Sequence, residues 1–362
     1  MNQSNGTMLV FIGSYAEAKD NGVYVYRMDT ETGALTPLDQ VAGLQNPTFL
    51  SLDAGKKRLY AIAERLVDGQ RQGAAVTFEI DPASGKLTEI GRVGTFDTTT
   101  CHIQRDATNR FFAVASYSGG KVGLSAAGEN DTVGELLDVR QHEGGSVHPE
   151  RQDRPHPHSV FFSPDNRFAF VPDLGMDRIR GYRLDPVAGK LAFHGDTAVQ
   201  PGAGPRHLAF HPNGAYAYVI NELDSTVTGF RYDADSGAMR TIQVVSTLPE
   251  GFAGENACAE VQISPDGGFL YGSNRGHDSI VVYAIDRETG ALSVVEHVST
   301  GGGHPRHFSL SPEGDYLLAA NRDSDNIVVF RVDRRSGKLE YTGHTVQASK
   351  PVCVKMARFP AR

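Results

Sequence analysis

Short apolar segments, turn residues and aromatic or β-branched segments follow one another in the same order at four places in the chain. The strings are VFFSPDNRFAFVPD from Val160, LAFHPNGAYAYVINE from Leu208, VQISPDGGFLYGSN from Val261 and FSLSPEGDYLLAAN from Phe308. Each joins two runs of strand-forming residues across a turn that begins with Pro, which predicts a β-hairpin. Alternating runs such as TVTGFRYD, SIVVYAID and NIVVFRVD follow, and they predict a third strand beside the hairpin.

A second pattern, Asp followed after three variable residues by Gly, recurs half a unit away from these hairpins. It reads DTETGAL from Asp29, DPASGKL from Asp81, DPVAGKL from Asp185, DADSGAM from Asp233, DRETGAL from Asp286 and DRRSGKL from Asp333, with a degenerate seventh copy, NDTVGEL, from Asn130. Successive glycines of this pattern are 47 to 55 residues apart. The Asp carboxylate caps such a turn and the Gly accepts a positive φ, so each copy predicts a tight connection between antiparallel strands.

Seven units of four antiparallel strands, without helical periodicity, predict an all-β fold, a seven-bladed β-propeller. The last unit ends with one strand, PVCVKMARF from Pro351, and the three strands that it lacks stand at the start of the chain, in MLVFIGSY, NGVYVYRMD and the stretch after Gly33. We therefore expect one blade to combine strands from both termini, because this pairs strand edges that would otherwise be open. Residues 1–362 are predicted to form a single domain, although length alone favours two or more.

Composition and charge exclude several classes of partner. The chain has 43 acidic and 35 basic residues, a formal net charge of −8 and no basic run longer than Arg334–Arg335, so no nucleic-acid partner is expected. No apolar window reaches the ~18 residues of a membrane span and no signal peptide is recognisable, so we expect a cytoplasmic protein without a membrane partner. Cys101, Cys258 and Cys353 lack metal-binding or disulfide spacing and are expected to be free thiols. The sequence leaves the oligomeric state open.

Polar residues gather at one edge of the predicted blades, where the innermost strand begins and the second strand ends. Those before the first strands include His102, His156, His158, Arg206, His207, Glu255, Asn256, Arg306 and His307. Those at the ends of the second strands include Glu64, Asp173, Glu222, Arg275, His277 and Arg322. In antiparallel blades both positions lie at the same mouth of the central channel, so these side chains are expected to converge. A cationic pocket in an acidic protein predicts a small anionic ligand.

Some of these residues also have a purely structural interpretation. Glu222 and Glu255 can serve as ion-pair partners of the arginines, and His207 can pack between blades with one ring nitrogen bonded. The arginines themselves are harder to explain structurally, because guanidinium groups that point into one channel repel one another without an anion or carboxylate between them.

The stretch from Arg140 to Ser159, RQHEGGSVHPERQDRPHPHS, is polar and lacks strand periodicity. Its four histidines leave a transition-metal site open, because His-x-His on an extended segment points both rings to one face. The shortage of carboxylate and Cys ligands favours instead a loop that covers the channel mouth, and no metal or other cofactor is predicted. Motifs of serine hydrolases (GxSxG), zinc peptidases (HExxH), P-loops and dinucleotide-binding folds are absent from the sequence.

Long co-linear strings resemble the seven-bladed β-propeller lactonase family, which includes bacterial 6-phosphogluconolactonase and fungal carboxymuconate cyclase. These strings are GPRHLAFHPNGAYAYVINELDSTV, GENACAEVQISPDGGFLYGSNRGHDSI, HPRHFSLSPEGDYLLAANRDSDNIVVF and PVCVKM, and the likeness runs from about Leu9 to Phe359. The resemblance implies metal-independent hydrolysis of 6-phospho-D-glucono-1,5-lactone to 6-phosphogluconate, in the pentose phosphate pathway. A muconate-type lactonising or delactonising enzyme and a non-catalytic interaction scaffold stay open as alternatives.

By motif, the catalytic set that the resemblance implies falls on His158, Arg206, Glu222 and Arg275. Glu222 or His158 would activate water, while Arg206 and Arg275 would stabilise the oxyanion and the substrate anion. The residues expected to bind the substrate, a small anionic sugar phosphate, are His102, His156, His207, Glu255, Asn256, His277, Arg306 and Arg322. Arg306, and less directly Arg322, would hold the phosphate. Where many relatives carry Asn-Tyr-Gly, this chain has Ser116-Tyr117-Ser118, a difference that would alter substrate fit.

Overall fold

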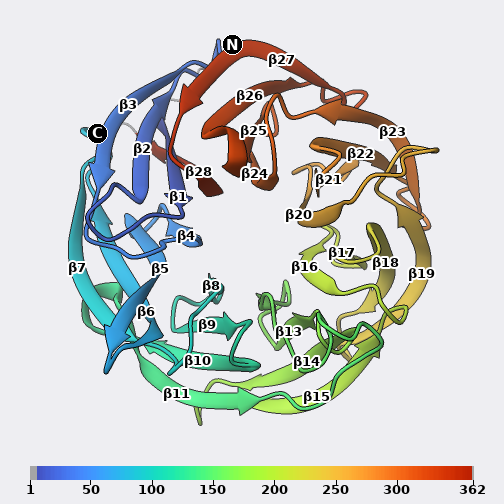
Figure 1. Ribbon diagram of the computed structural model, residues 1–362, viewed down its shortest axis with the longest axis horizontal. Helices are drawn as coiled ribbons and strands as arrows, with labels where there is room; N and C mark the ends of the chain where they lie inside the picture. The colour runs from blue at the N-terminus through green and yellow to red at the C-terminus, as the bar shows by residue number, and fades with distance from the viewer. Residues whose placement is uncertain (1–5, 361–362) are drawn as a thin grey trace.

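Seven four-stranded antiparallel sheets surround a central channel in the computed structural model, which describes residues 6–360 (Figure 1). The predicted seven-bladed β-propeller is confirmed. Apart from two short 3-10 turns, at Glu129–Asp131 and Arg322–Ser324, the regular structure of residues 6–360 is β-strand. Within these residues, no helix is long and apolar enough to cross a bilayer.

Six sheets are built from consecutive strands. The first three are β4 (Leu50–Asp53), β5 (Arg58–Val67), β6 (Gln70–Ile80) and β7 (Leu87–Gly94); β8 (His102–Arg105), β9 (Phe111–Ser116), β10 (Lys121–Ala127) and β11 (Val133–Gln141); and β12 (Phe161–Phe162), β13 (Phe168–Asp173), β14 (Arg178–Asp185) and β15 (Lys190–Ala198). The next three are β16 (Pro205–Phe210), β17 (Tyr216–Asn221), β18 (Thr226–Asp233) and β19 (Ala238–Ser246); β20 (Ala257–Ile263), β21 (Phe269–Arg275), β22 (Ser279–Ile285) and β23 (Leu292–Ser299); and β24 (Pro305–Leu310), β25 (Tyr316–Asn321), β26 (Asn326–Val332) and β27 (Leu339–Gln347).

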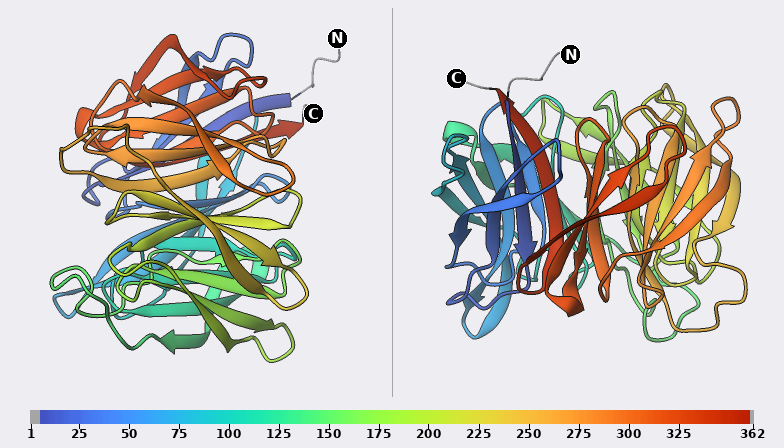
Figure 2. Two further views of the ribbon diagram at one scale, coloured as in Figure 1. Left: turned by 90° about the vertical axis from the view of Figure 1, so that its right-hand side faces the viewer. Right: turned by 90° about the horizontal axis from the view of Figure 1, so that it is seen from above.

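The seventh sheet closes the ring by combining both ends of the chain, as the sequence predicts. Its order is β28 (Pro351–Pro360), β1 (Gly6–Ser14), β2 (Val23–Met28) and β3 (Leu35–Val41). β28 pairs antiparallel with β1, with Leu9 opposite Ala357, and Figure 2 shows the two strands side by side. This pairing leaves neither strand with an open edge on that side.

The Asp-x-x-x-Gly turns form as expected at six of the seven copies. At Asp29 the carboxylate accepts a bond from the Glu31 amide (2.8 Å), the Gly33 amide bonds the Asp29 carbonyl (2.8 Å), and Gly33 has φ +85°. The degenerate seventh copy is a wrong prediction, because Gly134 lies inside β11 rather than in a turn. There Asn130 takes the left-handed conformation (φ 56°), which Asn tolerates better than most residues.

Apolar side chains fill the spaces between neighbouring blades. Met8, Val10 and Ile12 of β1, for example, pack with Leu318 and Ala320 of β25, and all five are buried. The innermost strands of the blades stand around the channel, with β4, β8, β16, β20, β24 and β28 facing it in Figure 1. This rigid ring fixes the positions of residues at the starts of inner strands, which are the residues predicted to form a site.

Candidate active site

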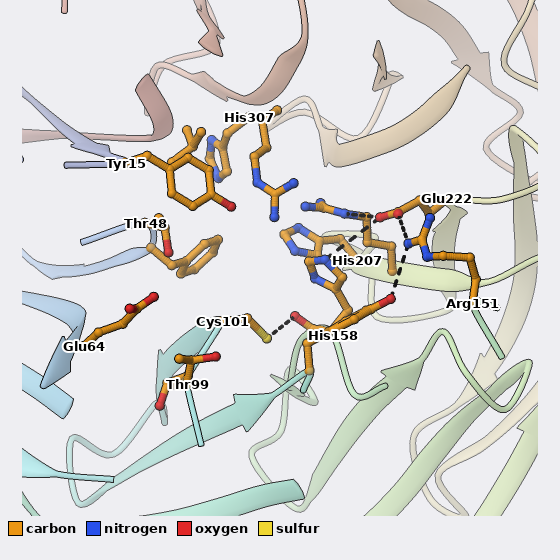
Figure 3. A pocket seen from close by; sticks show the side chains of 16 residues that line it. Tyr15, Thr48, Glu64, Thr99, Cys101, Arg151, His158, His207, Glu222 and His307 are labelled. Atoms are coloured by element: carbon orange, nitrogen blue, oxygen red, sulfur yellow. Dashed lines mark hydrogen bonds and ion pairs between the residues drawn. The ribbon is translucent and has the colours of Figure 1, made fainter. Parts of the chain in front are cut away.

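A cavity of about 440 Å³ opens at the channel mouth where the inner strands begin. Its wall includes Glu64, Arg151, His158, Arg206, Glu222 and Arg306 (Figure 3). A second cavity, of about 330 Å³, lies further along the same inner strands, where Ser51, Gln104 and Met356 line it. Phe49 and His207 line both cavities and so separate them.

β-Bulges place two of the three arginines that line the cavity. In β16 the pairing with β17 skips Arg206, and in β24 the pairing with β25 skips Arg306 in the same way. The extra residue of a bulge is released from the ladder and its side chain is redirected, a device common beside active sites. A bulge in β20 likewise releases Ala259 and Glu260 from the ladder.

Glu222, directly after β17, is the centre of an arginine cluster. Its Oε2 lies 3.0 Å from Arg206 Nε and 2.9 Å from Arg275 Nη2, and its Oε1 lies 2.6 Å from Arg151 Nη2. Burial alone would raise the pKa of Glu222, but the charges of Arg275, Arg206 and Arg151 hold it well below the usual range. Glu222 is therefore a carboxylate whose two oxygens are both occupied by guanidinium groups.

Backbone carbonyls fix two of these arginines. Arg206 Nη1 donates to the Ala259 carbonyl (2.5 Å), while Arg275 donates to the carbonyls of Ala257 (3.0 Å) and Cys258 (2.6 Å). Burial, together with the like charges of Arg275 and Arg306, lowers the pKa of Arg206 to about 9. The single carboxylate of Glu222 therefore does not balance the positive charge around it, and the cluster favours a further anion.

Arg306 is the guanidinium group best placed to receive that anion. It lines the cavity, it lies over the ring of Tyr15 with 5.8 Å from Cζ to the ring centroid, and within residues 6–360 it forms no ion pair. Arg206 and Arg275 both experience its charge.

His158 reaches the same cluster as a neutral imidazole. Its Nε2 lies 4.0 Å from Glu222 Oε2, and its buried Nδ1 has no hydrogen-bond partner within the described part of the chain. Burial, followed by the charge of Arg206, lowers the pKa of His158 well below its ordinary value. A neutral imidazole can accept a proton, so His158 is chemically suited to act as a base.

Two further histidines share a buried carboxylate between the two cavities. His207 Nδ1 lies 2.8 Å from Glu260 Oε2, and His307 Nε2 lies 3.2 Å from the same oxygen. Burial lowers the pKa of His207 well below its ordinary value and that of His307 to about 3. The interpretation of His207 as a packed histidine with one bonded nitrogen agrees with this arrangement.

These neutral histidines predict a steep loss of stability in acid. His102, His158, His207, His304 and His307 have lowered pKa values in the fold, so near pH 5 the unfolded chain binds five protons that the folded chain does not. Asp224 offsets one of them, because burial raises its folded pKa to about 6. Near pH 5 the remaining four protons should lower the free energy of unfolding by about 5.5 kcal/mol for each pH unit that the pH falls, at about 1.4 kcal/mol per proton.

Urea denaturation at a series of pH values measures this slope. A His158→Gln variant, which removes one of the titrating groups, should reduce the slope by about 1.4 kcal/mol per pH unit. Equal free energies of unfolding at pH 7 and pH 5 would show that the buried histidines are not neutral in the folded protein.

Several residues predicted to bind substrate do not line this cavity. Asn256 donates to Ser225 and Asn274, His277 Nδ1 bonds the Ser279 hydroxyl, and Arg322 pairs with Asp323. Glu255 is exposed. All four lie at strand ends on the predicted edge, and the side chains of Asn256, His277 and Arg322 bond to neighbouring groups on that edge.

Two predicted histidines lie behind the cavity rather than in it. His156 stacks on the Tyr117 ring, with 4.2 Å between centroids, and its Nδ1 lies 2.9 Å from the Tyr117 carbonyl. His102 lines the second cavity and packs against Phe49, with 4.3 Å between centroids. Arg275 does not line the first cavity either, but it contacts Glu222 directly.

The segment between β11 and β12 contributes a residue that the sequence reasoning missed. The polar stretch begins after Gln141, since Arg140 and Gln141 still belong to β11. Its Arg151 lines the cavity and contacts Glu222 and the Tyr117 hydroxyl (3.3 Å). No periodic signal marks Arg151, because it belongs to a loop and not to a repeated strand position.

Two histidines of this loop, His142 and His148, have hydrogen-bond partners within the protein. His142 lies between Asp173 Oδ2 (2.6 Å) and the Tyr182 hydroxyl (2.8 Å), and His148 Nδ1 accepts a bond from the Arg151 amide (3.2 Å). Residues 6–360 contain no group of three or more His, Cys, Asp or Glu side chains placed to hold a metal ion. The loop therefore forms part of the cavity wall, to which it contributes Arg151.

Comparison with known proteins gives a consistent family assignment. A family model described as "Lactonase, 7-bladed beta-propeller" matches residues 9–356. A 6-phosphogluconolactonase of Bacillus subtilis is 37% identical over 298 residues, which cover 82% of this chain and 83% of the relative. A protein of the same description from Formosa agariphila is 34% identical over 308 residues, with 83% and 86% covered.

A solved structure agrees over almost the whole chain. The periplasmic gluconolactonase PpgL of Pseudomonas aeruginosa superposes with a TM-score of 0.90 at 33% identity, covering 97% of this chain and 99% of its own. The family model, the similar sequences and this structure all describe lactonases. The chain thus belongs to the seven-bladed β-propeller lactonase family and is a lactone hydrolase.

Proposed function

We propose that the substrate is 6-phospho-D-glucono-1,5-lactone and that the cavity at the channel mouth hydrolyses it to 6-phosphogluconate. The observation that carries this proposal is the uncompensated positive charge of the cavity. Arg151, Arg206 and Arg275 share the single carboxylate of Glu222, while Arg306 has no ion-pair partner within residues 6–360. Such a cluster is suited to an anionic lactone, because guanidinium forks bind phosphate oxygens in pairs.

The proposed reaction begins with attack of water on the lactone carbonyl carbon. Arg206 stabilises the negative charge that develops on the carbonyl oxygen, because its guanidinium is fixed in a buried position before the substrate arrives. Arg275 does not line the cavity, but it pairs with Glu222 and adds positive charge next to the oxyanion site. The bond between the carbonyl carbon and the ring oxygen then breaks, and the ring oxygen takes a proton to become a hydroxyl.

We assign the general base to His158 rather than Glu222. Both carboxylate oxygens of Glu222 are held by arginines, which makes it a poor proton acceptor. His158 is neutral, and its Nε2 points toward the cluster (Figure 3). A bound phosphate would offset the arginine charges that depress the His158 pKa, so the substrate itself would make this base stronger. His158 would take the proton from water and return it to the ring oxygen.

These steps require no metal ion, and we propose that the enzyme is metal-independent. With this substrate the reaction belongs to the pentose phosphate pathway and hence to the cytoplasm. The relatives described as 6-phosphogluconolactonases support this choice, whereas PpgL is described as a periplasmic gluconolactonase, so the phosphate has to be tested directly.

Arg306→Met provides that test. The variant should raise the KM for 6-phosphogluconolactone by about 10- to 100-fold, because hydrogen bonds to a charged group are lost. The KM for unphosphorylated glucono-1,5-lactone should change little. The matched control is Arg322→Met, because Arg322 pairs with Asp323 and does not line the cavity. If the KM values for both lactones rise by the same factor in Arg306→Met, Arg306 does not recognise the phosphate.

A further inference from the structure

The wall opposite the arginine cluster carries carboxylate and hydroxyl groups instead of cations. Figure 3 shows Glu64, Thr48 and Thr99 across the cavity from Glu222 and Arg151. Glu64 belongs to β5, Thr48 precedes β4 and Thr99 precedes β8, so three chain segments from two neighbouring blades build this wall. The cavity is thus cationic on one side and acidic and hydroxylated on the other.

These side chains have hydrogen-bonding capacity that the protein does not use. The Thr48 hydroxyl has no bond within residues 6–360, and the Thr99 hydroxyl has only a 3.2 Å contact with Ser118. Glu64 Oε1 accepts one bond from Asn46 Nδ2 (3.1 Å).

Glu64 Oε2 is the least satisfied of these atoms. It is buried with no hydrogen-bond donor within the described part of the chain, and its ion-pair partner at 3.3 Å, Arg71, has a side chain that is 60% exposed. An ionised carboxylate offers about four acceptor positions. An Oε2 atom that is shielded from solvent, and whose one partner is the ion pair with exposed Arg71, can take further donors, and its place on the cavity wall suggests a ligand that brings hydroxyl groups.

We infer that Glu64, Thr48 and Thr99 form a polyol-binding wall, which recognises the ring hydroxyls of the lactone. This inference deepens the proposed function and rests on it only in taking the substrate to be a polyhydroxylated lactone. Neighbouring sugar hydroxyls donate to a carboxylate, and threonine hydroxyls accept from or donate to the remaining ones. Phe49 and Tyr15 also line the cavity and add apolar ring atoms beside this wall.

The wall also determines orientation and selects against a second anionic group. With Glu64 on one side and the arginines on the other, a lactone with one anionic end binds with that end toward the arginines. A lactone with two free carboxylates, such as a carboxymuconolactone, would place one of them near Glu64 and be repelled. Glu64 is therefore a specificity-determining residue that favours aldonolactones over dicarboxylate lactones.

Equilibrium binding of three six-carbon probes to Glu64→Gln tests this inference. Calorimetry would measure the affinities of D-gluconate (one carboxylate and five hydroxyls), hexanoate (one carboxylate, no hydroxyls) and adipate (two carboxylates). We expect wild-type protein to prefer gluconate over the other two. Glu64→Gln should reduce that preference at least tenfold, and adipate should bind more tightly than it does to wild type.

The opposite shifts for gluconate and adipate separate recognition from damage, because a distorted cavity would weaken both. Glu79→Gln is the matched control, since Glu79 lies on β6 of the same blade, is 57% exposed and pairs with Arg58 away from the cavity. Equal affinity of wild-type protein for gluconate and hexanoate, or an unchanged preference in Glu64→Gln, would overturn the inference. Failure of the proposed function would instead appear as absence of phospholactone turnover by wild-type enzyme with the gluconate preference intact.

Discussion

Replacing Glu222 with glutamine is expected to lower the free energy of unfolding by about 3–5 kcal/mol, the usual cost of removing one partner from a buried ion pair. The change keeps the shape of the side chain and removes its charge. Arg206, Arg275 and Arg151 would then face one another without a carboxylate between them. Lactone turnover should fall with it, because the guanidinium groups would separate and the oxyanion site would lose its geometry.

Urea denaturation and turnover measurements on the same preparation test this prediction. Inorganic phosphate should stabilise Glu222→Gln more than wild type, since an added anion takes the place of the missing carboxylate. Glu79→Gln, which removes an exposed carboxylate, should cost less than about 1 kcal/mol. A Glu222→Gln variant with wild-type stability and no added response to phosphate would mean that the arginines do not depend on Glu222.

Arg206→Met is expected to lower kcat by about 100- to 1,000-fold, the range found when one oxyanion donor is removed. Arg206 is the buried guanidinium that lines the cavity and is fixed by both Glu222 and the Ala259 carbonyl. Methionine keeps much of the apolar stem, so the loss should fall on kcat more than on folding.

Steady-state kinetics of Arg206→Met beside Arg154→Met measure this effect. Arg154 is exposed on the loop that carries Arg151, so its replacement makes the same change in net charge outside the cavity. Arg154→Met should retain nearly wild-type kcat. A loss below tenfold in Arg206→Met would remove Arg206 from the oxyanion role and require another donor.

The fold could be predicted from the sequence because its signals are local and repeated. In each Asp-x-x-x-Gly copy the glycine marks a turn position that needs a positive φ. The motif recurs once per unit, so the number of copies predicts the number of blades. The pairing of the two chain ends is predictable because the last unit of the sequence has only one strand, and the three strands that it lacks stand at the start of the chain. The prediction of the seventh turn is wrong because Asn130, and not Gly134, takes the left-handed conformation there. Gly134 lies in β11 instead. A motif of this kind reports a conformation that more than one residue type can adopt.

The site could be predicted only in part, because strand topology gives the edge on which a residue lies but not the direction of its side chain. Arg206 and Arg306 turn into the channel since bulges release them from the ladder, and no sequence pattern predicted those bulges. Asn256 and His277, on the same edge, bond to neighbouring turns instead. Arg151 and Glu260 carried no periodic signal, the first in a loop and the second within an inner strand.

The most direct test of the proposed function is the rate of 6-phosphogluconolactone hydrolysis by the purified enzyme. The lactone would be generated in situ, the spontaneous rate subtracted, and the assay run with and without a metal chelator. We predict acceleration that the chelator does not reduce, and a lower KM than for unphosphorylated glucono-1,5-lactone. Absence of acceleration above the spontaneous rate would contradict the assignment of this substrate to the arginine-lined cavity.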